Sequence, residues 1–353
     1  MTLPKLSSRR VEAPDSLDAI NDLYYERGWT DGLPIVPPTE ERVRAMLALL
    51  GREPQESLGK MGPGNGTVTL EKLAVNAVMA GCKPEHFPVV VAAVKALLAE
   101  EFNIAGVSAT TGGAVPLIVV NGPIAGELGI NADTGAFGAG YRANACIGRA
   151  VRLAMRNLGG ARPGEVDKST LGHPGKYTFC IAENEERSPW NPFHVDLGYQ
   201  PEESTVTVVG ITGFHPIIEA SAGSGRDVLK TVCSAITPWG TLAFYVPARE
   251  AQVVLVLGPE HAREIAEAGF SKRDVQMYVF QHARFPVGQL RGHTYWEGRT
   301  WPAWIDDTND NEMVPAVSRP ENVLVFVVGG DGRHSAWLPT WLSTRAVTVA
   351  IER

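Results

Sequence analysis

The chain has 353 residues, of which 44% are hydrophobic and 20% charged, and its formal net charge is −7. This negative balance argues against a general nucleic-acid binder, which normally presents a basic face. No uninterrupted apolar run approaches the roughly 18 residues that a transmembrane helix needs, and no apolar segment of a secretory signal follows the first residues. We therefore expect a cytoplasmic globular protein that acts on a small molecule, alone or as a homo-oligomer, and that binds neither nucleic acid nor membrane.

The N-terminal third has the pattern of a helical region. Ser16 can cap a helix that runs to about Arg27, and Thr39 can cap a second helix. The stretch between them, residues 28–38, is rich in proline and predicts an extended connection. The other elements expected here are a glycine-rich loop at 59–66, a helix over 70–81 and a helix from Pro84 to about Phe102.

From residue 115 onward, short apolar runs alternate with helical patterns. Three continuous aliphatic runs begin at Val115, Val253 and Val323, and each ends in glycine. Such runs are typical of strands buried on both faces. Further strands are expected over 177–182, 205–211 and 344–351, and further helices over 143–157, 225–236, 261–268 and 271–284. Ser271 is a good cap for the last of these helices.

The order of these elements predicts an α/β fold with a largely parallel or mixed sheet covered by helices. We expect a helix-rich N-terminal region over 1–103, followed by two α/β lobes over 104–200 and 201–353. The first two aliphatic runs end in Asn-Gly-Pro and Leu-Gly-Pro, which suggests a duplicated strand–turn–helix unit, although the stretches between them do not match. Ligands in such folds usually bind at the loops beyond the carboxyl ends of the strands.

The first candidate segment for ligand binding is 129–149, which is rich in glycine and leads into a helix. Glycines let the backbone approach a ligand closely, and the helix N-terminus offers unpaired N–H groups to an anion. Arg142 and Asn144 lie at this entry, where they could bind a carboxylate or a phosphate. The glycine spacing differs from the G-x-G-x-x-G pattern of dinucleotide sites, so the sequence names no cofactor. The alternative is a surface loop followed by an amphipathic basic helix.

The second candidate segment is 172–196. Lys176 precedes a predicted strand on which Cys180 faces away from its aromatic neighbours, and the strand ends in Glu183-Asn184-Glu185-Glu186. Carboxylates held close together in a cleft raise one another's pKa, which makes one of them a competent acid or base. We expect Glu183 in that role, and Lys176, Asn184 and His194 as groups that bind the substrate. The alternative is a solvated turn.

A third loop, 329–335, directly follows the aliphatic run that begins at Val323. Its three glycines predict a tight turn that can cradle a ligand oxygen. Arg333 and Ser335 could contact the substrate, and His334 is a candidate acid–base group because imidazole titrates near neutral pH. We expect this loop to complete a site formed by residues 129–196. A histidine that is only hydrogen-bonded in a turn is the alternative.

The cysteines are widely spaced, without a C-x-x-C pair, which favours free, reduced thiols over a disulfide framework; they are Cys82, Cys146, Cys180 and Cys233. Cys82 lies just before a predicted helix and next to Lys83, a setting that can lower a thiol pKa and produce a nucleophile. The alternative is a residue that only packs at the helix end. Neither paired-cysteine nor H-E-x-x-H spacing is present, so the sequence does not indicate a dedicated metal site.

Four stretches together resemble a known protein family: residues 28–43 (GWTDGLPIVPPTEERV), 80–85 (AGCKPE), 180–186 (CIAENEE) and 329–335 (GGDGRHS). This family is bacterial, and its members are described only as hypothetical or as similar to the "UGSC" (seleno)proteins. The resemblance implies a bacterial cytoplasmic protein and thiol or selenol redox chemistry. The chain contains no Cys-Gly-Ser-Cys or comparable dithiol, so no catalytic residue is carried over.

Three functions follow from these patterns. The first is an enzyme, a hydrolase or lyase, that acts on a small anionic or amide-like molecule. Glu183 or His334 would move protons, and Cys82 or Cys180 would be the nucleophile if the chemistry is covalent. The second is a thiol-dependent reductase component. The third is a non-catalytic binding or assembly subunit.

Overall fold

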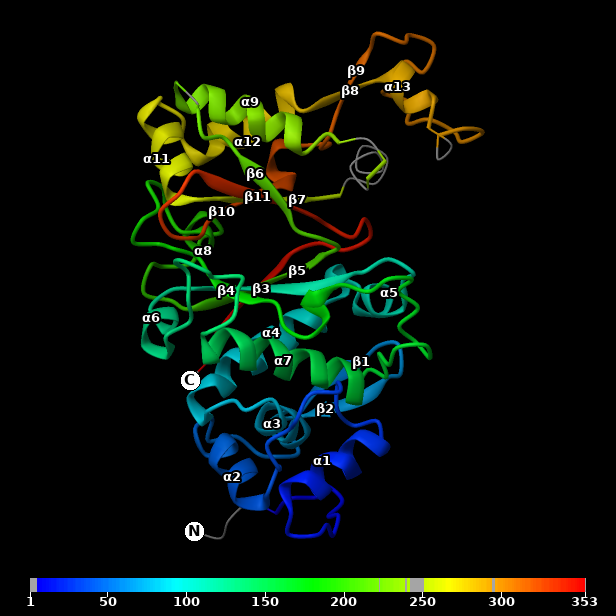
Figure 1. Ribbon diagram of the computed structural model, residues 1–353, viewed down its shortest axis with the longest axis vertical. Helices are drawn as coiled ribbons and strands as arrows, with labels where there is room; N and C mark the ends of the chain where they lie inside the picture. The colour runs from blue at the N-terminus through cyan, green and yellow to red at the C-terminus, as the bar shows by residue number, and fades with distance from the viewer. Residues whose placement is uncertain (1–4, 222, 239, 242–250, 294–295, 353) are drawn as a thin grey trace.

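The computed structural model describes residues 5–221, 223–238, 240–241, 251–293 and 296–352. Its centre is a pair of four-stranded sheets that lie face to face, with helices covering the outer face of each sheet (Figure 1). The predicted α/β class is confirmed. Both sheets are mixed: each contains one parallel pair of strands, and its other pairs are antiparallel.

The two sheets have the same strand order and the same strand directions. The first consists, in order, of β4 (Cys180–Ala182), β3 (Val115–Asn121), β5 (Thr205–Ile211) and β12 (Val347–Ala350). The second consists of β10 (Val323–Val327), β7 (Val253–Leu257), β11 (His334–Pro339) and β6 (His215–Ile218). In each sheet the first pair is parallel and the next two are antiparallel. This repetition supports the duplicated unit, with β3 and β7 in equivalent places.

The fourth strand of each sheet is supplied by the other half of the chain. The chain leaves β5 in the first sheet and enters β6 in the second, and it later leaves β11 in the second sheet and enters β12 in the first. The two crossings meet, because Ile211 and Thr340 form a β-bridge and the Thr212 N–H donates to the Pro339 carbonyl (2.8 Å). The two sheets are therefore interlinked through their backbones.

The long aliphatic runs are explained by burial on both faces. In β3, Val115, Leu117 and Val119 point into the layer between the sheets, whereas Ile118 and Val120 point toward the helices. Side chains of a strand alternate between the two faces of its sheet. Every position of β3, β5, β7 and β10 is consequently buried, as the continuous apolar pattern predicted.

Helices form the outer layers (Figure 1). On the first sheet lie α4 (Phe87–Leu97) and α7 (Arg142–Asn157), with α3 (Leu70–Met79), α2 (Glu40–Ala48) and α1 (Leu17–Glu26) farther out. On the second sheet lie α9 (Gly225–Ala235), α11 (Pro259–Glu267) and α12 (Lys272–His282). The short elements are β1 (Ser57–Met61), β2 (Gly66–Thr69), η1 (Pro84–His86), η2 (Glu100–Phe102), α5 (Ile104–Ala109), α6 (Ile124–Leu128), η3 (Pro174–Lys176), α8 (Phe193–Asp196), β8 (Arg284–Pro286), α13 (Val287–Arg291), β9 (Met313–Pro315) and η5 (Pro320–Asn322).

The predicted helix caps are confirmed. The side chain of Ser16 accepts a hydrogen bond from the Ala19 N–H, and Thr39 accepts one from Arg42. Ser271 forms a reciprocal capping box with Asp274. These residues satisfy N–H groups that the first helical turn leaves without a partner, which is why the sequence marks helix starts clearly.

Three predicted elements are wrong in detail. The loop expected over 59–66 is confined to the turn at 62–65, because its two ends belong to β1 and β2. The helix expected from Pro84 to Phe102 is divided into η1, α4 and η2, because Pro88 cannot donate a backbone hydrogen bond and a new helix starts around it. The strand expected over 177–182 is reduced to Cys180–Ala182, since η3 ends only at Lys176.

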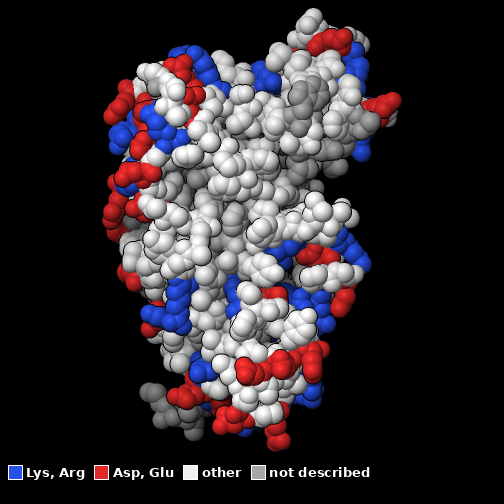
Figure 2. Space-filling view, viewed as in Figure 1, with Lys and Arg blue, Asp and Glu red and all other residues white. Residues whose placement is uncertain are grey.

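On one face of the molecule, charged side chains are sparse across the centre (Figure 2). On the face shown in Figure 2, the central band carries few coloured atoms, whereas Lys, Arg, Asp and Glu gather toward the two ends. The described residues contain no helix that is both long and apolar enough to cross a membrane.

Candidate functional site

The loops after β3, β4 and β10 meet at one edge of the paired sheets. The backbone N–H of Asn184 donates to the Val327 carbonyl (2.8 Å), and that of Gly329 donates to the Ala132 carbonyl (2.8 Å). The Asn184 side chain also donates to the Gly329 carbonyl (3.1 Å). Residues 129–196 thus contact the 329–335 loop, at the carboxyl ends of parallel strands.

At this edge the apolar layer between the sheets becomes polar. Glu183 follows β4 and is buried, with only 3% of its surface exposed. Its Oε2 accepts hydrogen bonds from Asn121 Nδ2 (2.6 Å) and the Phe193 N–H (2.8 Å). Its Oε1 lies 3.5 Å from the Val327 nitrogen and 4.0 Å from Lys272 Nζ. Burial raises the pKa of Glu183, and the positive charge of Lys272 opposes this effect only in part.

His194 follows Phe193, whose N–H binds Glu183, and its side chain is completely buried. Neither of its ring nitrogens has a hydrogen-bond partner among the residues that the structure describes. Nδ1 is 3.8 Å from Oε1 of Glu185, a carboxylate that accepts from Asn121 Nδ2 (2.8 Å) and from the Gly122 N–H (2.8 Å). An unsatisfied buried polar group costs about 1–3 kcal/mol, so an imidazole kept in this state needs an explanation beyond packing.

The polar groups extend from this buried position to the surface. Lys272 Nζ pairs with Asp196 Oδ2 (2.7 Å) and donates to the Asn191 carbonyl (2.5 Å). The Lys272 side chain is 9% exposed and that of Asp196 is 37% exposed. We call the following six residues the strand-end cluster: Asn121, Glu183, Glu185, His194, Asp196 and Lys272. Two of them, Asn121 and Lys272, were missed in the sequence.

The other candidates of the 129–196 segment make contacts within the protein. Arg142 donates from Nε and Nη2 to the Gly81 carbonyl (3.1 and 2.9 Å). Asn144 accepts from the Asn131 N–H (2.8 Å) and donates to the Asn131 carbonyl (3.0 Å). Lys176 forms an ion pair with Asp167 (2.5 Å). Arg142, Asn144 and Lys176 therefore brace loops through these contacts.

The side chains of Arg333 and Ser335, in the 329–335 loop, contact residues that do not belong to the strand-end cluster. Arg333 forms a two-pronged ion pair with Glu264, and His334 is exposed at the start of β11. The Ser335 hydroxyl accepts from the Gly258 N–H (3.1 Å) and lies 2.8 Å from His261 Nδ1. Nε2 of His261 faces the Glu219 carbonyl (3.2 Å), so Nε2 carries the proton and the Ser335 hydroxyl donates to Nδ1. This buried pair holds the turn between β7 and α11.

The cysteines are free thiols, as expected, and their pKa values are all raised. Burial raises the pKa of Cys82 well above its ordinary value, and the nearby Cys146 and Cys180 add to this effect. Burial also raises the pKa of Cys180 to about 12. Desolvation of the thiolate therefore opposes activation of Cys82 and favours the alternative, a residue that only packs at the helix end.

This environment predicts the order of cysteine alkylation. In the folded protein at pH 7.5, we expect iodoacetamide to modify the half-buried Cys146 first and to leave Cys82, Cys180 and Cys233 unmodified, because these three are buried. Peptide mass mapping over time would measure this. Denatured protein, in which all four should react, is the control. Faster modification of Cys82 or Cys180 than of Cys146 would contradict the expectation.

Comparisons of the chain with protein-family models, with curated proteins and with solved structures gave no match. The strand-end cluster is therefore interpreted from its own geometry.

Proposed function

We propose that the protein is an enzyme, a hydrolase or lyase, that converts a small anionic or amide-like molecule by acid–base chemistry at the strand-end cluster. The observation that carries the proposal is His194, whose imidazole is buried 3.8 Å from the Glu185 carboxylate with no hydrogen-bond partner among the described residues. Such an arrangement costs stability, and a site for proton transfer accounts for it.

Each group in the cluster has a chemical role in this proposal. His194 is the general base, and Glu185, 3.8 Å from its Nδ1, orients the ring and stabilises its protonated form. Glu183 is the general acid, because its raised pKa lets it keep a proton at a higher pH than an ordinary glutamic acid. Lys272 supplies a positive charge for an anionic group, and the substrate approaches from the exposed side at Asp196.

The alternatives have less support. A cysteine nucleophile or a thiol-dependent reductase, which the resemblance to UGSC-type proteins suggests, needs an accessible thiolate, and burial raises the pKa of Cys82 and Cys180. A purely structural role for the cluster would favour a hydrogen-bonded His194. We also propose a bacterial cytoplasmic location, where free thiols stay reduced.

His194→Leu tests the proposal because its two expected effects have opposite signs. Leucine removes the unsatisfied ring nitrogens, so the free energy of unfolding should stay the same or rise, by up to about 2 kcal/mol. Turnover of any substrate found in a panel of small carboxamides and hydroxy acids should fall about 10²–10⁴-fold. Urea unfolding and ammonia or alkene release measure the two effects.

Glu186→Gln is the matched control, because Glu186 is an exposed carboxylate one residue away from the cluster. It should change neither stability nor turnover. If His194→Leu lowered the free energy of unfolding by several kcal/mol, the imidazole would be a structural group and the proposal would fail whatever the substrate.

A further inference from the structure

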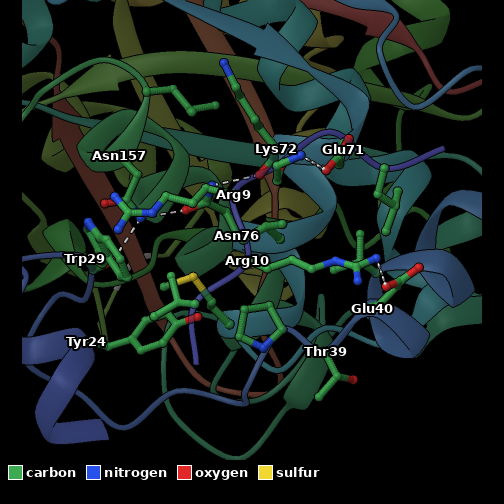
Figure 3. A pocket seen from close by; sticks show the side chains of 18 of the residues that line it. Arg9, Arg10, Tyr24, Trp29, Thr39, Glu40, Glu71, Lys72, Asn76 and Asn157 are labelled. Carbon is green, nitrogen blue, oxygen red and sulfur yellow. Dashed lines mark hydrogen bonds and ion pairs between the residues drawn. The ribbon is translucent and has the colours of Figure 1, made fainter. Parts of the chain in front are cut away.

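A cavity of about 600 Å³ lies far from the strand-end cluster, beneath the N-terminal segment (Figure 3). Helix α7 separates the two places: Asn144, near its start, braces the loop at the strand ends, whereas Asn157 at its end lines the cavity. This helix has 16 residues and is therefore about 24 Å long. The volume is within the range of roughly 300–1,000 Å³ that small-molecule sites occupy.

The cavity is enclosed by five parts of the chain. Residues 6–11 form a cover, which we call the strap. Beneath the strap lie α3, the start of α2 and the end of α7. Tyr24 of α1 and Trp29, which follows α1, also line the cavity. The rings of Tyr24 and Trp29 meet edge to face, with centroids 5.3 Å apart. Figure 3 shows this aromatic pair and Asn157 on one side of the cavity, and the Arg10–Glu40 ion pair on the other.

The strap is fixed by a buried carboxylate. Glu71, on α3, is only 1% exposed. Its oxygens accept hydrogen bonds from the backbone N–H groups of Ser7 (2.9 Å) and Ser8 (2.7 Å) and from the side chain of Gln55. Because the contacts use the backbone of the strap, its side chains remain available to the cavity. The strap is thus held in place mainly through its backbone.

The charges around the cavity favour an anion. Both acidic residues in the wall are already engaged: Glu40 with Arg10 and Arg44, and Glu71 with the strap. Arg9 has no ion pair or hydrogen bond within the described part of the chain, and it projects from the strap over an apolar wall that includes Val75, Met79 and Leu158.

We infer that this cavity binds a small organic carboxylate with an apolar body, whose carboxylate pairs with Arg9 and whose body packs against Tyr24, Trp29 and the apolar wall. A guanidinium paired with a carboxylate gives a charge-assisted contact, and the apolar body accounts for the aromatic and aliphatic lining. The site is separate from the proposed active site, so the inference holds or fails independently of the proposed function.

The experiment compares two acids with their uncharged counterparts on the full chain. Isothermal titration calorimetry would measure binding of octanoate and phenylacetate, and of octanol and 2-phenylethanol. We expect saturable, one-to-one binding of at least one acid, about tenfold tighter than that of its alcohol, which is the size of one charge-assisted hydrogen bond. Arg9→Ser should remove this preference for the acid, and Arg273→Ser, at an exposed arginine of α12, should leave it unchanged.

Variants that fill the cavity test whether the ligands bind there or on another apolar surface. Val75→Phe on α3 should abolish binding of both acids and alcohols, and thermal unfolding would verify that the variant folds. Ser8→Phe fills the cavity from the strap side, at an exposed residue whose contact with Glu71 uses mainly the backbone. Absence of saturable binding in the wild type, or full binding in either filled variant, would overturn the inference.

Discussion

Replacing Asp31 by alanine should lower the free energy of unfolding by about 3 kcal/mol, the cost of leaving one partner of a largely buried ion pair alone. Asp31 lies in the proline-rich connection between α1 and α2. Both of its oxygens accept from Arg149 of α7, each at 2.8 Å. The two side chains are only 14% and 13% exposed. The substitution also leaves the Leu33 N–H (3.2 Å from Asp31 Oδ1) without its partner.

Urea unfolding would measure this loss, and the ion pair between Arg273 and Glu321 offers a control. Its side chains are 51% and 61% exposed, so Glu321→Ala should cost no more than about 1 kcal/mol. Replacing both partners, as Asp31→Leu with Arg149→Met, should restore part of the stability, because no charge then remains buried alone. Equal losses for Asp31→Ala and Glu321→Ala would show that burial adds nothing to the Asp31–Arg149 pair.

Glu183→Ala should cost a similar amount, about 3 kcal/mol, because alanine removes an acceptor shared by two buried donors. Those donors are the side chain of Asn121 and the backbone N–H of Phe193, on two different segments. Glu183→Gln keeps one oxygen acceptor and should lose less. Urea unfolding of both variants at pH 7 tests the order.

The pH dependence of stability isolates the carboxyl group of Glu183. Burial raises its pKa in the folded state above the ordinary value of 4.5. Its contribution to stability is therefore fully present below about pH 4.5 and is lost as the pH rises through the folded pKa. Because Glu183→Gln cannot ionise, the stability of the wild type minus that of this variant should fall with pH from 4.5 upward. Glu186→Gln should follow the wild type, and a flat difference for Glu183→Gln would mean that the carboxyl group ionises normally.

Sequence patterns predicted those parts of the fold that depend on local chemistry. Ser16, Thr39 and Ser271 marked helix starts because a hydroxyl can cap a first turn wherever the rest of the chain lies. The aliphatic runs from Val115 and Val253 marked central strands because both faces of these strands are covered. The pairing of strands was not predictable, because the antiparallel strand β5 is as continuously apolar and buried as a strand of a parallel sheet.

The crossing strand β6 left little trace in the sequence, whereas β12 lies within the strand expected over 344–351. The four residues of β6, from His215 to Ile218, include a proline and have only one buried side chain. Such a strand at the edge of a sheet lacks both an alternating and a continuous apolar pattern. The strand β11 begins with His334 and Ser335 and follows a glycine-rich stretch, and this composition resembles a loop.

The candidate site was predictable only where its residues are close in sequence. Glu183, Glu185 and His194 lie within 12 residues of one another in one polar segment, and this density drew attention to them. Asn121 is a single polar residue at the end of an apolar strand, and Lys272 follows a helix cap in the other half of the chain. Only folding brings these two residues to Glu183, and no sequence spacing encodes that meeting.

The exchange of strands between the two sheets also affects how the chain emerges from the ribosome. Val208 of β5 pairs with Val347 of β12, so β5 has no neighbour on that side until the chain has been made past residue 350. During synthesis, β5 is a seven-residue apolar edge that can pair with the same strand of a second nascent chain. Strand β6 likewise lacks its pairing partner until β11 has been synthesised. Chaperone capture of the growing chain, and slow completion of both sheets in one late step, are the consequences of this topology.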